Sequence, residues 1–225
     1  MSAANTHAFQ GALFDWDGVI IDSHEQHEEA WVRLAAELGE ALPPGFFKDT
    51  FGMLNRNIIG DYLGWGDGDI PEIDRLGVRK EELYREVIRE VGIEPLPGVV
   101  RLLAGLHDAG VRCAVGSSTP RINLDTIMDM IGIKETFDEI VSADDVTRGK
   151  PDPQVFLLGA ERIGAPADGC VVFEDAHVGI EAGLAGGMKV VAVATTHPPE
   201  SLTRAHLVVE SLEEVDVEKL RGLFE

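Results

Sequence analysis

Two carboxylates spaced two residues apart, Asp15 and Asp17, stand in the segment Phe14-Asp15-Trp16-Asp17-Gly18, next to the first apolar stretch of the chain. Alternate residues of an extended chain project to the same face, so we expect these two side chains to point together. Burying them near a strand end costs free energy unless a cation or a polar ligand partners them. An ordinary turn at Asp17-Gly18 is the alternative, because Asp-Gly is a common turn dipeptide.

A second acidic pair, Glu174 and Asp175, follows the apolar stretch Cys170–Phe173. Asp175 could simply cap the helix that we expect to follow it. We favour a site for a hard cation, because carboxylate oxygens are typical ligands of magnesium.

Ser117 follows the apolar stretch that ends at Gly116, in Gly116-Ser117-Ser118-Thr119-Pro120. We expect Thr119 to cap a helix whose first residue is Pro120. The free N–H groups at a helix start favour binding of a phosphate, which would place Ser117 beside an anion. A plain helix cap explains the same residues without a ligand.

Lys150 precedes Pro151, and the residue before a proline avoids the helical conformation. We therefore expect Lys150 to be held extended, ahead of a helix that Asp152 caps and that has Pro153 in its first turn. Such a lysine can neutralise a phosphate or an attacking carboxylate, although a lysine in a loop is more commonly just solvated.

Short apolar stretches rich in Val, Ile and Ala must position these groups. From the second stretch onward they alternate with segments of helical spacing, which predicts an α/β fold: a doubly wound, Rossmann-like parallel sheet with helices on both faces. The polar groups then fall on the carboxyl edge of the sheet, where open parallel sheets bind ligands. The apolar stretches are Ala12–Ile21, Val111–Gly116, Glu139–Ala143, Cys170–Phe173, Lys189–Ala194 and His206–Val209, and we expect the first strand to end within Phe14–Gly18.

Residues 23–94 contain no convincing strand and show helical spacing instead, including a long helical segment near Val78–Val91. We predict a core domain made of residues 1–22 and 95–225, and an inserted all-helical cap domain made of residues 23–94. The return linker Gly92–Gly98 carries two prolines, which end a helix and stiffen the connection.

The 225 residues contain 40 acidic and 19 basic side chains, for a formal net charge of −21. A broad nucleic-acid-binding face needs a basic footprint and is excluded. A phosphate site must be made locally positive by a metal ion or by a few placed bases. We expect Cys113 and Cys170 to be buried thiols. No apolar run reaches the length of a membrane span and no leader is evident, so we expect a soluble cytoplasmic protein without membrane partners.

The four motifs together resemble those of the haloacid dehalogenase-like (HAD) superfamily, over about residues 9–196. The segment Phe14–Gly18 resembles its first motif, Ser117 its second, Lys150-Pro151 its third and Glu174-Asp175 its fourth. The stretches Phe173–Met188 and Arg79–Val87 are most similar to the branch that contains β-phosphoglucomutase and sugar-phosphate phosphatases, in which a helical cap follows the first motif.

The resemblance implies a role for each motif residue. Asp15 would be the nucleophile that forms an aspartyl-phosphate, and Asp17 the general acid and then base. Ser117 and Lys150 would hold the phosphoryl oxygens, with Ser118 among the substrate-binding residues. Mg²⁺ would be bound by Asp15, by the backbone carbonyl of Asp17 and by Asp175, with Glu174 nearby through water.

The resemblance also implies that the cap sets specificity. His27, Arg56 and Lys80 align with cap positions that face the substrate in β-phosphoglucomutase-like proteins, and Gly52 and Asn55 belong to the loop around Arg56. Solvated helix positions are the alternative for each of them. The expected partner is a small phosphorylated metabolite, with sugar phosphates as the favoured class, and the expected state is a monomer.

We favour a phosphatase over a β-phosphoglucomutase-type mutase, because Thr195-Thr196-His197-Pro198 is more similar to phosphatases of this branch. A dehalogenase would not need Asp17, and a phosphonate hydrolase normally has a non-acidic residue there. A phospho-receiver domain is the remote, non-enzymatic alternative; the long insertion after Asp15 and the late acidic pair argue against it.

Overall fold

The computed structural model describes residues 9–50 and 53–225. The contacts of the chain divide it into two compact units: unit 1 contains the described residues up to Asp22 and from Ile93 to Glu225, and unit 2 is Ser23–Gly92. In the described ranges, no helix combines the length and the apolar character that crossing a membrane requires.

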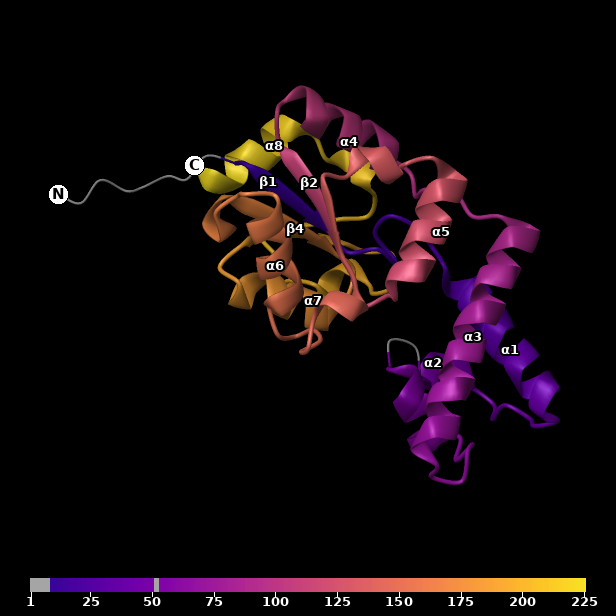
Figure 1. The fold of residues 1–225 in the computed structure, drawn as a ribbon. Coiled ribbons are helices and arrows are strands. Elements are labelled where there is room, and N and C mark those ends of the chain that lie inside the picture. Colours follow the sequence, from indigo (N-terminus) through magenta and orange to yellow (C-terminus); the bar gives the residue numbers. More distant parts are fainter. Residues whose placement is uncertain (1–8, 51–52) are drawn as a thin grey trace. The chain divides into compact units, whose positions relative to one another are not determined.

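Unit 1 is built on a six-stranded parallel sheet with the strand order β3-β2-β1-β4-β5-β6 (Figure 1). Every neighbouring pair in this order is parallel, so each connection must cross over a face of the sheet. The predicted α/β doubly wound fold is confirmed. The strands are β1 (Gly11–Phe14), β2 (Arg112–Gly116), β3 (Glu139–Val141), β4 (Cys170–Glu174), β5 (Lys189–Val193) and β6 (Leu207–Val209).

Helices cover both faces of the sheet: α4 and α8 lie on one side, and α6 and α7 on the other (Figure 1). The α-helices of unit 1 are α4 (Val99–Asp108), α5 (Arg121–Ile131), α6 (Gln154–Arg162), α7 (His177–Ala185) and α8 (Val217–Arg221). Short 3₁₀ segments are Lys134–Thr136, Ala143–Asp145, Ala167–Gly169, Pro199–Ser201, Leu212–Glu214 and Gly222–Phe224.

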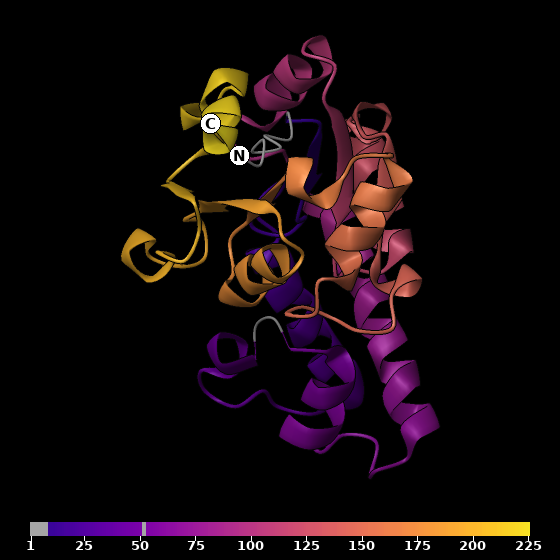
Figure 2. The same cartoon turned by 90° about the vertical axis from the view of Figure 1, so that its left-hand side faces the viewer.

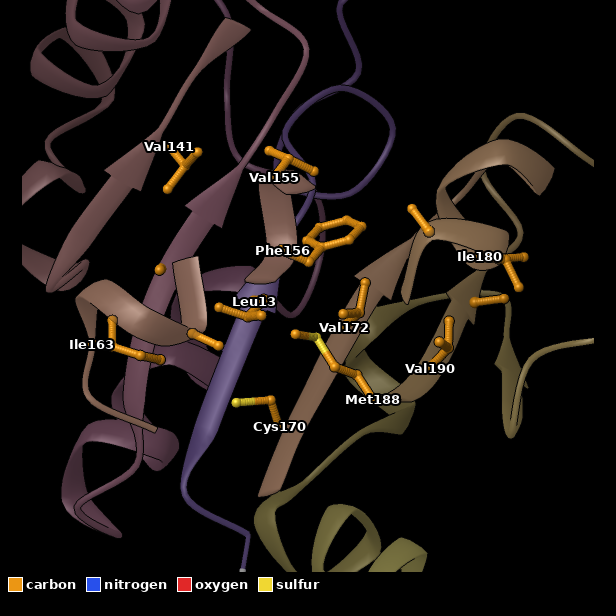
Figure 3. Close-up of a cluster of buried hydrophobic side chains, with 14 of the residues drawn as sticks. Leu13, Val141, Val155, Phe156, Ile163, Cys170, Val172, Ile180, Met188 and Val190 are labelled. Carbon is orange, nitrogen blue, oxygen red and sulfur yellow. The ribbon is translucent and has the colours of Figure 1, made fainter. Parts of the chain in front are cut away.

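One hydrophobic core cluster of unit 1 lies between the sheet and helices α6 and α7 (Figure 3). Leu13 of β1 and Val172 of β4 meet Phe156 of α6 and Ile180 of α7, and all four are fully or almost fully buried. Cys170 belongs to the same cluster, and both cysteines are free and buried, as predicted. Burial raises the pKa of each thiol to about 12, so both are protonated and inert at neutral pH.

Only the first part of the apolar stretch Ala12–Ile21 is a strand, because β1 ends at Phe14, the first residue of the segment where we expected the strand to end. The backbone carbonyl of Trp16 accepts hydrogen bonds from the N–H groups of Ile20 and Ile21, and Gly18 has a left-handed φ of 79°. Val19, Ile20 and Ile21 are completely buried in this turn. The apolar run reflected burial, and apolar character alone does not separate a buried strand from a buried turn.

Unit 2 contains helices and no strand within residues 23–50 and 53–92, as Figures 1 and 2 show for the segment that follows β1. Its main elements are α1 (His24–Leu38) and α3 (Ile70–Val91), which pack against each other. The helix predicted near Val78–Val91 begins earlier, because Asp69 and Pro71 supply a helix start there. The remaining elements are α2 (Phe46–Thr50) and a π-helical segment, Asn57–Tyr62.

We predict that Leu13→Ala lowers the free energy of unfolding by about 2–5 kcal/mol, because it leaves a cavity in the core between β1 and α6. Leu157→Ala is the matched control on the outer side of α6, where the side chain is 40% exposed. Guanidinium denaturation followed by circular dichroism measures both. Equal losses for the two variants would contradict this account of the core.

Candidate active site

One buried lysine bridges two of the predicted site carboxylates. The ammonium of Lys150 lies 2.7 Å from Oδ1 of Asp15 and donates to Oε1 of Glu174 at 2.6 Å. The Lys150 side chain is only 7% exposed and lies 4.8 Å from the ring centroid of Phe156. Asp15 directly follows β1, and its N–H donates to the carbonyl of Phe173 in the neighbouring strand β4. The sheet therefore brings together residues from three distant parts of the chain.

The acidic pair of β4 is placed by its own backbone. Oε2 of Glu174 accepts hydrogen bonds from the N–H groups of Asp175 and Ala176, both at 2.9 Å. A Cβ on Gly179 would overlap the Glu174 carboxylate, so this position of α7 accepts only glycine without rearrangement. The interpretation of Asp175 as a helix cap is wrong, because α7 begins at His177 and its N-terminal flank, Ala176, makes no side-chain cap.

The carboxylates of this cluster repel one another. The pKa of Glu174 is raised by burial first, and the Asp15 carboxylate adds to that effect while Lys150 opposes it. The pKa of Asp175 is raised by burial, then by Glu174 and Asp15. The pKa of Lys150 is raised despite its burial, because Asp15 and Glu174 stabilise the ammonium. The cluster thus holds more negative charge than one lysine can balance.

The composition of the cluster fits a divalent cation. Asp15, Glu174 and Asp175 each place a carboxylate oxygen within 4.8 Å of the others. Three carboxylates and one ammonium sum to a charge of −2 when all are ionised, so an ion of charge +2 would make the group neutral. An all-oxygen donor set is the kind that Mg²⁺ prefers over softer metals.

Asp175 is enclosed by Gly18 and Thr196. A Cβ on Gly18 would strike Oδ2 of Asp175, so the turn after β1 packs its backbone directly against this carboxylate. On the strand side, the hydroxyl of Thr196 donates to the same oxygen. Thr196 is a residue of this site to which the four motifs did not point.

Asp17 has a partner of its own. The hydroxyl of Thr119 donates to Oδ2 of Asp17 at 2.7 Å, and the N–H of Thr119 donates to Oγ of Ser117 at 3.0 Å. Ser117 lies directly after β2 and is buried, whereas Ser118 is exposed. The predicted Thr119 cap is wrong: α5 begins at Arg121, preceded by Pro120, and Thr119 instead links the ends of β1 and β2.

The segment after Lys150 differs slightly from its prediction. Helix α6 begins at Gln154, with Pro153 just before it, and Oδ1 of Asp152 accepts from the N–H of Gln154 at 3.0 Å. Asp152 therefore accepts a hydrogen bond from the first N–H group of α6, as a capping residue would, but it stands two residues before the helix and not directly before it.

In unit 2, three of the predicted substrate-binding residues form one partly buried cluster. Nζ of Lys80 lies 2.7 Å from Nδ1 of His27 and 2.8 Å from Oε1 of Glu81, and the amide of Asn55 donates to the same oxygen of Glu81. An ammonium has only donors, so Nδ1 of His27 accepts and the ring is neutral. Burial and then Lys80 lower the pKa of His27 to about 3.

The pKa of Glu81 falls to about 2: burial opposes the charged form, but the charge of Lys80 and the hydrogen bonds from Lys80 and Asn55 outweigh it. The His27 ring also stacks on Tyr84, with centroids 3.9 Å apart. Lys80 is thus held within unit 2 by the Glu81 carboxylate and by the rings of Trp31 and Tyr84.

Arg56 is not part of that cluster. It makes a two-pronged ion pair with Asp74 at 2.7 Å, and both side chains are largely exposed. Exposed pairs of this kind contribute little to stability and exchange readily. The predicted residue Gly52 lies outside the described residues.

The model of haloacid dehalogenase-like hydrolases matches residues 9–187. The chain belongs to this family. The family match includes all four motifs, from Asp15 to Asp175, and the predicted resemblance is confirmed.

Two curated relatives of this HAD chain are phosphatases. Hexitol phosphatase A of Escherichia coli is 34% identical over 214 residues, which cover 93% of this chain and 94% of the relative. The chloroplastic 5-amino-6-(5-phospho-D-ribitylamino)uracil phosphatase of Arabidopsis thaliana is 36% identical over 222 residues and 95% of this chain. The matched region spans 57% of the length of that plant protein.

Among solved structures, a β-phosphoglucomutase from Clostridium difficile is 26% identical, with a TM-score of 0.83 over 96% of this chain and 97% of the other. The predicted enzyme class, a HAD-type phosphoric monoester hydrolase, is confirmed by the family match and the phosphatase relatives.

The raised carboxyl pKa values predict a pH dependence of stability. Glu174 and Asp175 bind protons more tightly in the folded than in the unfolded state, whose ordinary values are 4.5 and 3.8. The stabilisation by protonation is complete below those values and is lost as the pH rises through the raised folded values.

With a chelator present, we therefore expect Asp175→Asn to be more stable than the unsubstituted protein at about pH 8, and this advantage to shrink towards about pH 5. Thermal unfolding across this range measures the difference. An advantage that stays constant with pH, or an Asp175→Asn protein that is the less stable at the alkaline end, would contradict the charge crowding.

Proposed function

We propose that this HAD hydrolase is a Mg²⁺-dependent phosphatase that cleaves a small phosphorylated metabolite through an aspartyl-phosphate on Asp15. The observation that carries the proposal is the contact of Asp15 with the buried ammonium of Lys150, beside the acidic pair of β4. A nucleophile, a fixed cation and a cation-binding acidic pair at one sheet edge are what phosphoryl transfer requires.

Asp15 is suited to be the nucleophile by position and charge balance. Its side chain is 14% exposed, so it can meet a substrate from the open edge of the sheet while Lys150 holds Oδ1 from inside. In the first step, a carboxylate oxygen of Asp15 attacks phosphorus and the bond to the leaving oxygen breaks. Lys150 and Ser117 would bind phosphoryl oxygens during the transfer.

Asp17 is suited to move the proton. It gives a proton to the leaving oxygen in the first step, and in the second step it takes one from the water that attacks phosphorus. The bond between phosphorus and Asp15 then breaks and inorganic phosphate is released. The Thr119 hydroxyl, which donates to one Asp17 oxygen, keeps the carboxyl oriented while it changes charge.

The residues that would hold Mg²⁺ are Asp15, Asp175 and the backbone carbonyl of Asp17, with Glu174 nearby. When bound, the ion supplies positive charge that offsets the negative charge of the phosphoryl group and of the surrounding carboxylates. Glu174, whose oxygens already accept from two N–H groups and Lys150, is better suited to hold a water of the ion than to bind the ion itself.

We place substrate recognition in unit 2, on His27, Asn55, Arg56 and Lys80, with Gly52 in the same loop and Ser118 on the core side. The exposed Arg56–Asp74 pair can exchange its carboxylate for a substrate anion at low cost. Sugar phosphates and related polyols are the favoured class, because the names of the relatives specify a hexitol and a phosphoribitylamino compound.

We predict that Asp15→Asn reduces phosphate release to the level of a protein-free control, because an amide cannot form the acyl-phosphate bond. Phosphate release is measured with a panel of phosphorylated sugars and polyols, with Mg²⁺ and with a chelator. Asp108→Asn at the exposed end of α4 is the matched control and should keep full activity. Unchanged turnover by Asp15→Asn would refute the proposed function.

Asp17→Asn should lower kcat by about 10²–10⁴-fold while leaving Mg²⁺ binding intact, because the carbonyl that would meet the ion belongs to the backbone. Steady-state kinetics and calorimetric titration with Mg²⁺ separate the two effects. A variant that lost Mg²⁺ affinity but kept kcat at saturating Mg²⁺ would contradict the proton-transfer role.

A mutase is the second candidate, favoured by the match to the β-phosphoglucomutase structure over nearly the whole chain. A mutase would convert β-glucose 1-phosphate only with a bisphosphate primer and would release little inorganic phosphate. Release of phosphate from a generic aryl phosphate, without any primer, supports the phosphatase.

A further inference from the structure

We propose that Thr196, supported by His197, is a positioning residue that fixes the Asp175 carboxylate for binding a divalent cation; this inference rests on the proposed function. The pairing of strands in the sheet brings Thr196 close to Asp175. Strand β5 pairs with β4, Glu174 stands opposite Ala192, and the segment after β5 therefore arrives beside Asp175 at the same edge. Thr196 is the third residue after the end of β5.

The contact of Thr196 is made with the carboxylate itself. The Thr196 hydroxyl donates to Oδ2 of Asp175 and also lies 3.4 Å from the backbone carbonyl of the same residue. Gly18 packs against the same carboxylate, since a Cβ at this position would overlap Oδ2. Oδ2 is thus engaged by protein groups, which would leave Oδ1 for a cation that Asp175 shares with Asp15 and Glu174.

His197 fixes the direction of that hydroxyl. Its Nδ1 lies 2.9 Å from Oγ1 of Thr196. A hydroxyl has a single proton, so once that proton is donated to Asp175, Nδ1 of His197 must be the donor to Oγ1. The neighbouring ring of His177, at the start of α7, meets His197 edge to face with centroids 4.8 Å apart, which restrains the imidazole.

These contacts form a short directed chain from His197 through Thr196 to Asp175. Chained hydrogen bonds polarise one another, and partners behind a metal ligand orient it and restrict its rotation. Without the Thr196 hydroxyl, the carboxylate could turn away from the site or draw the Lys150 ammonium towards itself. Removal of such a partner typically weakens metal binding by about 10–100-fold.

The test compares Thr196→Val, which replaces the hydroxyl by a methyl group of similar size, with Thr196→Ser, which keeps the hydroxyl. Thr195→Val is the matched control, one residue earlier in the same segment. Isothermal titration of the full chain with Mg²⁺ gives the Kd, and the Mg²⁺ concentration for half-maximal phosphate release gives an independent value.

We expect Thr196→Val to raise both values by about 10-fold or more, with kcat largely recovered at saturating Mg²⁺. Thr196→Ser and Thr195→Val should stay close to the unsubstituted protein. A Thr196→Val protein that binds Mg²⁺ normally would overturn the inference while leaving the proposed function intact. Should the unsubstituted protein bind no Mg²⁺ at all, both would fall together.

His197→Ala provides a second measurement if Thr196→Val does not fold, as judged by circular dichroism. It should raise the Kd for Mg²⁺ in the same direction but by less, because the hydroxyl remains and loses only its orienting donor. An unchanged Kd for His197→Ala would overturn the role assigned to the histidine.

Discussion

The crowding of carboxylates around one ammonium is the constraint on which this site depends. Lys150 touches two acids and lies among three, in a place where water is largely excluded. Such a group is stable only if every oxygen has a donor or a cation, because an unpaired buried charge costs several kcal/mol. Two backbone N–H groups donate to Glu174 and the Thr196 hydroxyl donates to Asp175, so the protein itself supplies part of these partners. A bound divalent ion would balance the remaining negative charge of the three carboxylates.

The fold satisfies this constraint by bringing strand ends together. Because β1 lies between β2 and β4, the groups that follow these three strands must share one edge of the sheet. Two glycines make the approach close enough: Gly18 lets the turn after β1 touch Asp175, and Gly179 leaves room for Glu174 beneath α7. The strongly acidic chain therefore places the ammonium of Lys150 within a site whose carboxylates still outnumber it.

The sequence was sufficient to predict those features that depend on a local pattern of residues. The alternation of apolar stretches predicted the parallel sheet, and the acids after β1 and β4 predicted the cluster with Lys150. It was insufficient where the decisive contact joined distant residues. Thr119 has the sequence context of a helix cap, yet its hydroxyl holds Asp17. The run Trp16–Ile21 is as apolar as a strand, but Gly18 turns it back on itself. No spacing rule could connect Thr196 with Asp175, because only the pairing of β4 with β5 makes them neighbours.

The two ends of the helical insertion leave the core at almost the same point. The N–H of Leu96 donates to the carbonyl of Ile20 at 2.8 Å, and Ile21 forms an isolated bridge with Pro95. These contacts join the two chain segments on either side of the insertion, and all four residues belong to unit 1. Since the entropy of closing a loop grows only slowly with its length, segments of very different size can be carried between these two positions. The insertion could thus be lengthened, rebuilt or exchanged during evolution without breaking one ladder bond of the sheet, so that a new substrate range can arise while the phosphoryl-transfer chemistry stays as it is.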